Sequence, residues 1–293
     1  MAQPVVAILA IGDMGRGVAV RLREGGARVV TSLQGRGEGT ATRARSAGVE
    51  ALDDQALVRK AEVVLSIVPP GAALDLARRM AGAMSAADAR PAYIDCNAIS
   101  AATMRQVGEI VRASGAVVGD AGIVGGPPDK ARGTKIYASG PALPAFDTLK
   151  ALGLDVRRIG SEIGQASALK MGYGGFTKGV QALATALMVS ARRAGVAEAL
   201  EAELAESQAA LLAMLDRVLP GMPPKAYRWV AEMREGAASL AEAGLPPELF
   251  EGAARLYAEI AATPTAQTIP IGGRAEAGRA ALMDALAREL DRS

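Results

Sequence analysis

The stretch "ILAIGDMGRGVAVRL", residues 8–22, decides the fold of this chain. It places Ala10-x-Gly12-x-x-Gly15 between an apolar run and the start of a helical pattern. In a strand–turn–helix of this kind, Gly12 lets the backbone approach a pyrophosphate and Gly15 lets the helix pack against the strand. The helix N-terminus then offers free N–H groups to the anion. Alanine replaces the first glycine, so the placement after a strand is what favours a dinucleotide site over a structural turn.

Outward from this turn, short apolar runs alternate with helical patterns through the first half of the chain. They predict strands within residues 5–12, 27–33, 47–52, 61–70, 91–100, 115–126, 134–140 and 154–160. Continuous β-branched runs separated by helices favour a mostly parallel sheet that is covered on both faces. The predicted class is therefore α/β, with an N-terminal Rossmann-type doubly wound sheet.

After residue 160 the strand-like runs disappear, and helices rich in Ala, Leu, Glu and Arg dominate. We therefore expect a dinucleotide-binding domain over residues 1–160 and an all-helical domain over residues 161–293. The second domain is predicted to begin with one long interdomain helix of about 30 residues, which Gly195 ends.

Composition excludes several classes of function. The net charge of +2 comes from interspersed acids and bases, which is not the concentrated basic face of a nucleic-acid-binding protein. A single cysteine, Cys96, excludes an intramolecular disulfide and a cysteine-clustered zinc site. The absence of histidine removes Ser-His-Asp and Cys-His catalysis and histidine-based metal sites. Any proton transfer must use Lys, Tyr, Asp, Glu or water, and we expect no metal.

The chain has no apolar stretch of the roughly 18 residues that a membrane span needs, and its N-terminus has no basic region before the first apolar run. We therefore expect a cytoplasmic protein with neither a membrane nor a nucleic acid as partner.

The segment after the second predicted strand bears on the choice of dinucleotide. An NAD site usually has an acidic residue about 20 residues beyond the glycines, where it binds the ribose 2′-hydroxyl. Here the first acid, Glu38, comes well past the strand end. Hydroxyls and guanidinium groups, which suit a 2′-phosphate, stand there instead: Thr31, Ser32, Arg36 and Arg43. The sequence predicts a preference for NADP(H) over NAD(H), the alternative being an arginine-rich solvated loop.

A second stretch, "SALKMGYGGFTKG" (residues 167–179), keeps two lysines and several glycines in a predicted helix. Spaced at i, i+3, i+4, i+7 and i+8, its polar and glycine positions share one helix face: Lys170, Tyr173, Gly174, Thr177 and Lys178. The glycines would thin this face so that a ligand or another backbone can approach. The alternative is a solvated lysine with glycines that merely allow helix packing.

Four motifs, in order, resemble the β-hydroxyacid dehydrogenase and 6-phosphogluconate dehydrogenase superfamily. They are "AIGDMGRGVA", "LSIVPP", "DAGIVGG" and "GQASALKMGYGG". The chain looks closest to a poorly characterised branch with a short helical C-terminal domain, and it is distantly similar to imine reductases.

The resemblance implies a role for residues in each motif. Lys170 would exchange a proton with the substrate hydroxyl or carbonyl, and Tyr173 stands where the phosphogluconate enzymes have a histidine. The cofactor would contact Gly12, Asp13, Met14 and Gly15 at its pyrophosphate, Thr31, Ser32 and Arg36 at its ribose, and Val68, Pro69, Pro70 and Asn97 at its nicotinamide. The substrate would contact Gly122, Val124, Gly125, Gly126, Gly174 and Lys178. Val124 replaces the family's serine and Gly174 its asparagine, so the substrate is not carried over from the family.

We therefore expect an NADP-dependent oxidoreductase that transfers hydride between nicotinamide and a small hydroxy or keto acid, with Lys170 as general acid and base. The alternatives are an imine reductase and a non-catalytic protein that senses dinucleotide. The expected substrate is a small molecule, with a carboxylate as one candidate class. The resemblance also implies a homodimer formed through the helical domain.

Overall fold

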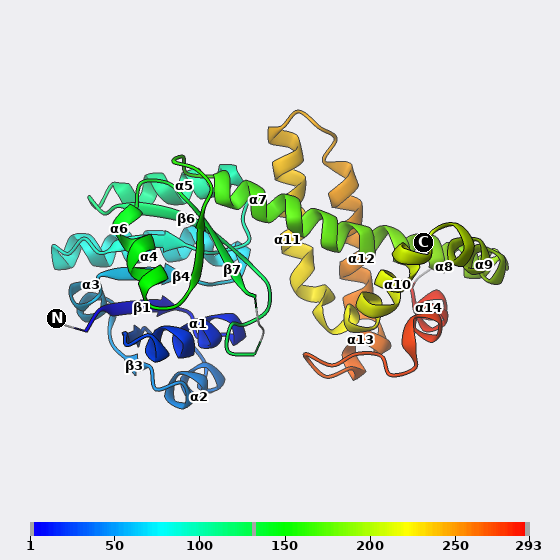
Figure 1. Ribbon diagram of the computed structural model, residues 1–293, viewed down its shortest axis with the longest axis horizontal. Coiled ribbons are helices and arrows are strands. Elements are labelled where there is room, and N and C mark those ends of the chain that lie inside the picture. The colour runs from blue at the N-terminus through cyan, green and yellow to red at the C-terminus, as the bar shows by residue number, and fades with distance from the viewer. Residues whose placement is uncertain (1–2, 131–132, 291–293) are drawn as a thin grey trace. The chain divides into compact units, whose positions relative to one another are not determined.

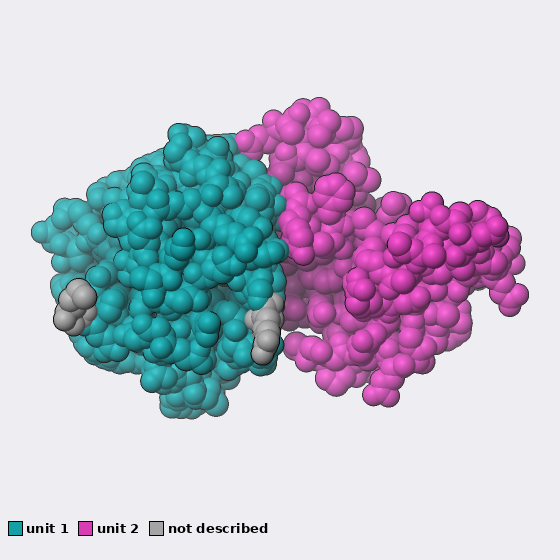
Figure 2. Space-filling view, viewed as in Figure 1, with its two compact units in different colours: residues 1–171 teal, residues 172–293 magenta. Residues whose placement is uncertain are grey.

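The computed structural model describes residues 3–130 and 133–290 and divides the chain into two compact units, Met1–Met171 and Gly172–Ser293 (Figure 2). The first unit holds the sheet, and the second unit is helical. The sequence placed the boundary at residue 160, whereas the first of these units includes the start of the following helix.

The first unit is built on an eight-stranded sheet in the order β3-β2-β1-β4-β5-β6-β7-β8 (Figure 1). Every strand from β3 to β6 in this order is parallel to its neighbour, and β7 pairs antiparallel with β6. The strands are β1 (Val5–Leu9), β2 (Arg28–Thr31), β3 (Glu50–Ala51), β4 (Val63–Ser66), β5 (Ala92–Asp95), β6 (Val118–Val124), β7 (Lys135–Ser139) and β8 (Asp155–Arg158). This confirms the mostly parallel Rossmann-type sheet that the apolar runs predict.

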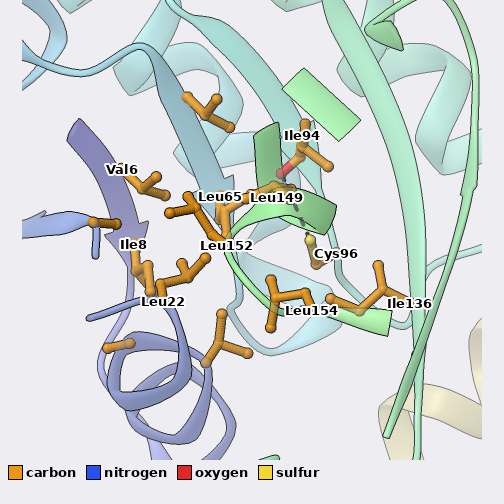
Figure 3. Packing of buried hydrophobic residues seen from close by; sticks show 14 of the residues in the cluster. Val6, Ile8, Leu22, Leu65, Ile94, Cys96, Ile136, Leu149, Leu152 and Leu154 are labelled. Atoms are coloured by element: carbon orange, nitrogen blue, oxygen red, sulfur yellow. Dashed lines mark hydrogen bonds between the residues drawn. The ribbon is translucent and has the colours of Figure 1, made fainter. Parts of the chain in front are cut away.

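Helices cover both faces of this sheet. One buried cluster takes its helical residues from α1, α2 and α6, and the other takes them from α3, α4 and α5. The elements are α1 (Asp13–Glu24), α2 (Glu38–Ser46), α3 (Asp54–Lys60), η1 (Pro70–Ala72), α4 (Ala73–Ala87), α5 (Ala101–Arg112) and α6 (Leu143–Ala151). Figure 3 shows the first cluster, in which Leu22 and Leu149 lie against residues of the central strands. Cys96 belongs to this cluster, and its burial raises the pKa of the thiol.

The predicted long helix runs from α7 (Gln165–Gly174) through η2 (Gly175–Gly179) to α8 (Val180–Arg193) (Figure 1). The segment η2 is a π-helical turn, which the sequence did not predict. Gly195 follows with a φ of 73°, a left-handed conformation that ends the helix as expected.

The second unit is formed by α8 and the helices that follow it. These are α9 (Ala197–Ser207), α10 (Ala209–Val218), η3 (Leu219–Gly221), η4 (Pro223–Lys225), α11 (Ala226–Glu242), α12 (Glu248–Ala262), α13 (Pro264–Thr268) and α14 (Gly278–Glu289). They share one apolar core, in which Tyr257 and Met283 are fully buried. The buried Arg279 donates to Asp216 at 2.7 Å and to Glu201 at 3.1 Å, which ties α14 to α10 and α9. None of the helices over the described residues is long and apolar enough to cross a membrane.

Candidate active site

The glycine turn between β1 and α1 has the geometry that a pyrophosphate needs. A Cβ built on Gly12 would meet no described atom within 4 Å, so the backbone is open at this position. A Cβ on Gly15 would stand 2.1 Å from the carbonyl oxygen of Ala10, so glycine is what lets α1 start this close to β1. Among the described residues no side chain caps α1 at Gly12, which leaves first-turn N–H groups for an anion. The turn therefore fits a dinucleotide.

The other two residues predicted at the turn differ in their surroundings. Asp13 is exposed in the first turn of α1, whereas Met14 is partly buried and packs against the apolar cluster on that face of the sheet.

The polar residues at the end of β2 and after it differ in burial and in their hydrogen-bond partners. The hydroxyl of Thr31 is buried and donates to the carbonyl oxygen of Ile8 at 2.7 Å, a bond that stabilises the sheet. Arg36 is exposed in the loop before α2. The guanidinium group of Arg43 lies at the glycine turn, because its Nε donates to the carbonyl oxygen of Ile11 at 2.9 Å.

Arg79 is a residue near this position that sequence reasoning missed. It lies on α4 and donates to the hydroxyl oxygen of Ser32 at 2.9 Å. Asp54 holds its guanidinium group through bonds of 2.7 and 2.8 Å. Although burial acts to raise it, hydrogen bonds from Arg79 and Ser32 hold the pKa of Asp54 below its ordinary value. No local sequence signal links Arg79 to Ser32, because only the tertiary fold brings α4 to the end of β2.

The loop after β4 is held by Asn97. The backbone N–H of Val68 donates to Oδ1 of Asn97 at 2.7 Å, and Nδ2 of Asn97 donates to Ser66 at 2.7 Å and to Asp95 at 2.7 Å. Val68 and Asn97 are therefore brought together as predicted, but the amide of Asn97 is buried and fixes the loop. Pro69 is exposed, and Pro70 begins η1.

A row of buried polar side chains crosses four neighbouring strands, at the last residues of β4, β5 and β7 and near the start of β6. Paired in register, the row consists of Ser66, Asp95, Asp120 and Ser139. Burial raises the pKa of Asp95 to about 7, and the neighbouring charge of Asp120 acts in the same direction. Burial also raises the pKa of Asp120.

Asp120 caps the N-terminus of α7. Its Oδ2 accepts hydrogen bonds from the backbone N–H groups of Gly164, Ala166 and Ser167, at 2.8, 3.0 and 3.1 Å. Ser139 donates to the same oxygen at 3.1 Å, and the hydroxyl of Ser167 donates to Oδ1 at 2.7 Å. A carboxylate at this end of a helix also interacts favourably with the helix dipole. Sequence reasoning assigned "DAGIVGG" to a substrate loop and missed that its aspartate holds the lysine helix.

Lys170 lies one turn further along α7, against the same strand. Its Nζ donates to the carbonyl oxygen of Ile123 on β6. A Cβ on Gly122 would stand 2.9 Å from the carbonyl oxygen of Ala166 and 3.0 Å from Cβ of Lys170. Because Gly122 has no side chain, β6 and α7 can approach each other closely at this position.

The remaining residues of the predicted substrate loop follow β6 directly. Gly125 has a φ of 121°, which favours glycine, and a Cβ there would stand 3.0 Å from Cα of Thr134. The hydroxyl of Thr134 donates to the carbonyl oxygen of Gly126 at 2.6 Å. Val124 is partly buried and pairs with Lys135 on β7. Lys170 is thus brought to the start of this loop.

The same loop continues across the first turns of α1. A Cβ on Gly17 would stand 2.4 Å from Oδ1 of Asp129 and 2.8 Å from Cβ of Pro127. Asp129 also forms an ion pair with Arg16, which lies between Gly15 and Gly17 in the sequence. The segment that follows the predicted substrate residues therefore contacts the helix that follows the predicted cofactor turn, within the first unit.

The last predicted residues lie in the second unit. Tyr173 is 50% exposed, and Gly174 is the last residue of α7. The predicted common face assumed α-helical spacing from Lys170 to Lys178, and the π turn at Gly175–Gly179 changes that spacing. Phe250 explains two of the glycines, since a Cβ on Gly175 or Gly179 would stand 2.7 or 3.0 Å from its ring.

Lys178 is paired within the second unit. It forms an ion pair with Glu232, and the side chains are only 15% and 19% exposed. Its Nζ also lies 5.8 Å from the centroid of the Trp229 ring, within the range of a cation–π contact. The hydroxyl of Tyr257 donates to the backbone carbonyl oxygen of Lys178 at 2.6 Å, which fixes the π turn from the other side.

A doubly wound sheet with an open glycine turn at the start of α1, and a lysine held at the end of β6, defines the class of NAD(P)-dependent dehydrogenases and reductases. Residues 5–153 match the family described as the NAD binding domain of 6-phosphogluconate dehydrogenase, and the chain belongs to this family. Residues 191–260 match a domain of unknown function, DUF1932.

Solved structures show the same fold. A conserved protein of unknown function, described as structurally similar to 3-hydroxyacid dehydrogenases, is 32% identical, with a TM-score of 0.69 over 87% of this chain and 96% of that chain. The 3-hydroxyisobutyrate dehydrogenase of Mycobacterium tuberculosis is 22% identical, with a TM-score of 0.67 over 89% and 94%. A reductive aminase from Aspergillus terreus, solved with NADPH, is 16% identical, with a TM-score of 0.51 over 89% and 93%.

Proposed function

We propose that this protein is an NADP-dependent oxidoreductase that transfers hydride between nicotinamide and a small hydroxy or keto acid, with Lys170 as general acid and base. The observation that carries this proposal is the placement of Lys170 against β6, with its amine at the carbonyl oxygen of Ile123. The loop that starts there continues to the first turns of α1, where Pro127 and Asp129 lie at Gly17 and Arg16. A lysine and a dinucleotide turn are the two parts that such a reaction needs, and this loop runs from the lysine to the helix that follows the turn.

The residues of the turn fit the cofactor. Gly12 and the first turn of α1 would hold the pyrophosphate, and Val68 and Pro69 would border the nicotinamide. When bound, the nicotinamide supplies or accepts the hydride. Asn97 keeps the Val68 backbone in place through its 2.7 Å bond, so the loop is already formed before the cofactor arrives.

The guanidinium groups near the end of β2 support the preference for NADP(H). Arg36 is exposed, and Arg79 reaches Ser32. Glu38, the first acid after β2, is engaged in an ion pair with Arg45, and Asp54 is engaged with Arg79. Guanidinium groups bind a 2′-phosphate in a way that carboxylates cannot.

The substrate is proposed to lie at the loop after β6. Backbone N–H groups of Gly125 and Gly126 would hold a carboxylate or another anion. The Lys170 amine would give its proton to the carbonyl oxygen during reduction and take it back from the hydroxyl during oxidation. Lys178 would add a cation for an anionic substrate if its pairing with Glu232 is exchanged for the substrate.

Imine reduction is the second candidate. Gly174 replaces the family's asparagine, and Val124 replaces its serine. Tyr173, which carries a hydroxyl group, is a half-exposed residue of α7. These replacements remove polar groups that recognise a hydroxy acid. The fold is shared with a reductive aminase that was solved with NADPH.

We also propose that the helical unit forms a homodimer. Large apolar side chains are exposed along η2 and α8, where Phe176, Leu183 and Leu187 are 79%, 58% and 56% exposed. An exposed apolar stripe of this kind is typical of a protein–protein interface.

Titration calorimetry with NADPH and NADH tests the cofactor. We expect tight NADPH binding and weak NADH binding, and R36A should weaken only NADPH binding. R45A is the matched control, because Arg45 is an exposed arginine of α2 that is already paired with Glu38. Equal affinity for the two dinucleotides would contradict the NADP preference, and binding of neither would contradict the oxidoreductase proposal. A screen of hydroxy acids, keto acids and imines with the preferred cofactor then separates the two reactions.

A further inference from the structure

We propose that Asp120 is the positioning residue for Lys170, an inference that rests on the proposed role of Lys170. Asp120 itself is fully buried. It acts on the helix that carries the lysine, through the bonds to the first turn of α7.

The first step concerns the helix. The Oδ2 atom of Asp120 accepts the N–H groups of Gly164, Ala166 and Ser167, which have no partner in the preceding turn of a helix. Because these bonds come from one atom on a buried strand, they fix both the rotation and the axial position of the first turn.

The second step concerns the lysine. Lys170 lies one turn beyond Ala166, and its Nζ donates to Ile123 on the strand that carries Asp120. Strand β6 therefore holds α7 at both ends of this turn, with Asp120 at the helix N-terminus and Ile123 at the amine. Gly122, between them, leaves room for this close approach.

The third step concerns the chemistry of Asp120. In each of the hydrogen bonds described above, Asp120 is the acceptor, as an ionised carboxylate must be. An asparagine has nearly the same shape and can still accept the backbone bonds through its amide oxygen, with its NH2 group turned toward the hydroxyl oxygen of Ser167. An alanine removes all of them. D120N should therefore restore most of what D120A loses.

The first experiment measures position without any turnover. The protein is labelled with a limiting amount of an amine-acetylating reagent, and the rate at each lysine is read by mass spectrometry. D120A should raise the labelling rate of Lys170 several-fold, because the amine is released from Ile123, whereas D120N should change it little. Lys178 is the internal control, since its partner Glu232 lies in the second unit. An unchanged rate at Lys170 in D120A would overturn the inference, and amide hydrogen exchange at Gly164 and Ser167 should rise in the same variant.

The second experiment is a double-mutant cycle on turnover. D120A should lower kcat about 10- to 100-fold, as misplacement of a catalytic group does, while the dissociation constant for NADPH stays within about twofold. In a K170M background, D120A should cause no further loss, because it acts only through the lysine. An equal loss in both backgrounds would show a merely structural role and overturn the inference. Undiminished turnover of K170M alone would instead contradict the proposed function, and the labelling result separates the two failures.

Discussion

Gly122 and Ala166 lie so close together that a Cβ on Gly122 would stand 2.9 Å from the carbonyl oxygen of Ala166. This contact sets the distance between β6 and α7, and therefore between the predicted substrate loop and the lysine helix. It is a relationship between a strand and a helix far apart in the sequence, made possible by a missing side chain.

The G122A variant should move α7 away from β6. We expect a loss of about 1–3 kcal/mol in the free energy of unfolding, because the added methyl group meets backbone atoms that cannot rotate away. Turnover should fall with it. G172A is the matched control: Gly172 lies on α7, and its Cβ would meet no described atom within 4 Å. That variant should be neutral or more stable, by up to about 1 kcal/mol, since alanine favours a helix. Denaturant unfolding measures both, and equal effects would contradict the argument.

Replacement by alanine should affect different properties at the two glycines of the cofactor turn: NADPH binding at Gly12 and stability at Gly15. G12A keeps the fold, because the space above Gly12 is open, but its methyl group should weaken NADPH binding at least about tenfold, or about 1.4 kcal/mol. G15A should lower the melting temperature, because its Cβ would stand 2.1 Å from the carbonyl oxygen of Ala10. Calorimetry with NADPH and thermal unfolding without it separate the two effects. If G12A bound NADPH as the wild type does, Gly12 would not lie at the pyrophosphate.

The fold was largely predictable from the sequence, and the reason is local. The apolar runs that form the central strands, such as β4 and β6, are buried along nearly their whole length, because a parallel sheet covered on both faces requires apolar side chains on both. The open Gly12 and the crowded Gly15 were also predictable, since strand–turn–helix geometry assigns those roles to the spacing itself.

The parts that the sequence did not predict depend on contacts between distant segments. In the sequence, Asp120 is only the first residue of the motif "DAGIVGG". Its role as the cap of α7 depends on the packing of α7 against β6. Arg79 and Ser32 meet only because α4 packs beside the end of β2. The π turn at Gly175–Gly179 changes the helical spacing between Lys170 and Lys178. The common face of these residues was predicted from α-helical spacing, which does not hold across this turn.

The stability of the protein should depend on pH through Asp95. Burial raises its pKa from 3.8 to about 7, so between about pH 4 and 7 the folded state keeps a proton that the unfolded state has released. The contribution of Asp95 to stability is therefore greatest at the acid end of this window and falls as the pH rises toward 7, by at most about 1.4 kcal/mol per pH unit.

The D95N variant isolates this effect. It cannot titrate, so the difference in unfolding free energy between D95N and the wild type should change across that window and level off above about pH 7. Asp120, whose pKa burial also raises, contributes in the same direction in both proteins, and its charge acts on Asp95 only in the wild type, so the difference reports Asp95 together with this coupling. A constant difference from pH 4 to pH 8 would contradict the raised pKa of Asp95.

Lys178 should distinguish the two proposed substrate classes. K178M removes the cation, so KM for a carboxylate substrate should rise about tenfold or more with little change in kcat, whereas a neutral imine should be unaffected. E232Q is the control, because it removes the charge of the partner and keeps the lysine. Steady-state kinetics with both substrate classes give the answer. An equal rise in KM for both would mean that Lys178 acts through the fold of the second unit.

The glycines of the π turn should prove to be packing residues for Phe250. A Cβ on Gly175 would stand 2.7 Å from Cζ of that ring, so G175A should destabilise the protein by about 1–3 kcal/mol. F250L alone should also destabilise it, because a smaller side chain leaves a cavity among the glycines.

The double variant decides between packing and ligand binding. If the glycine exists for the ring, F250L makes room for the added methyl group, and G175A/F250L should lose less stability than the sum of the single losses. Additive losses would contradict a direct contact. Unchanged stability in G175A with weakened substrate binding would instead return Gly175 to the predicted ligand face. Chemical denaturation of the four proteins gives the coupling free energy, whose sign separates these cases.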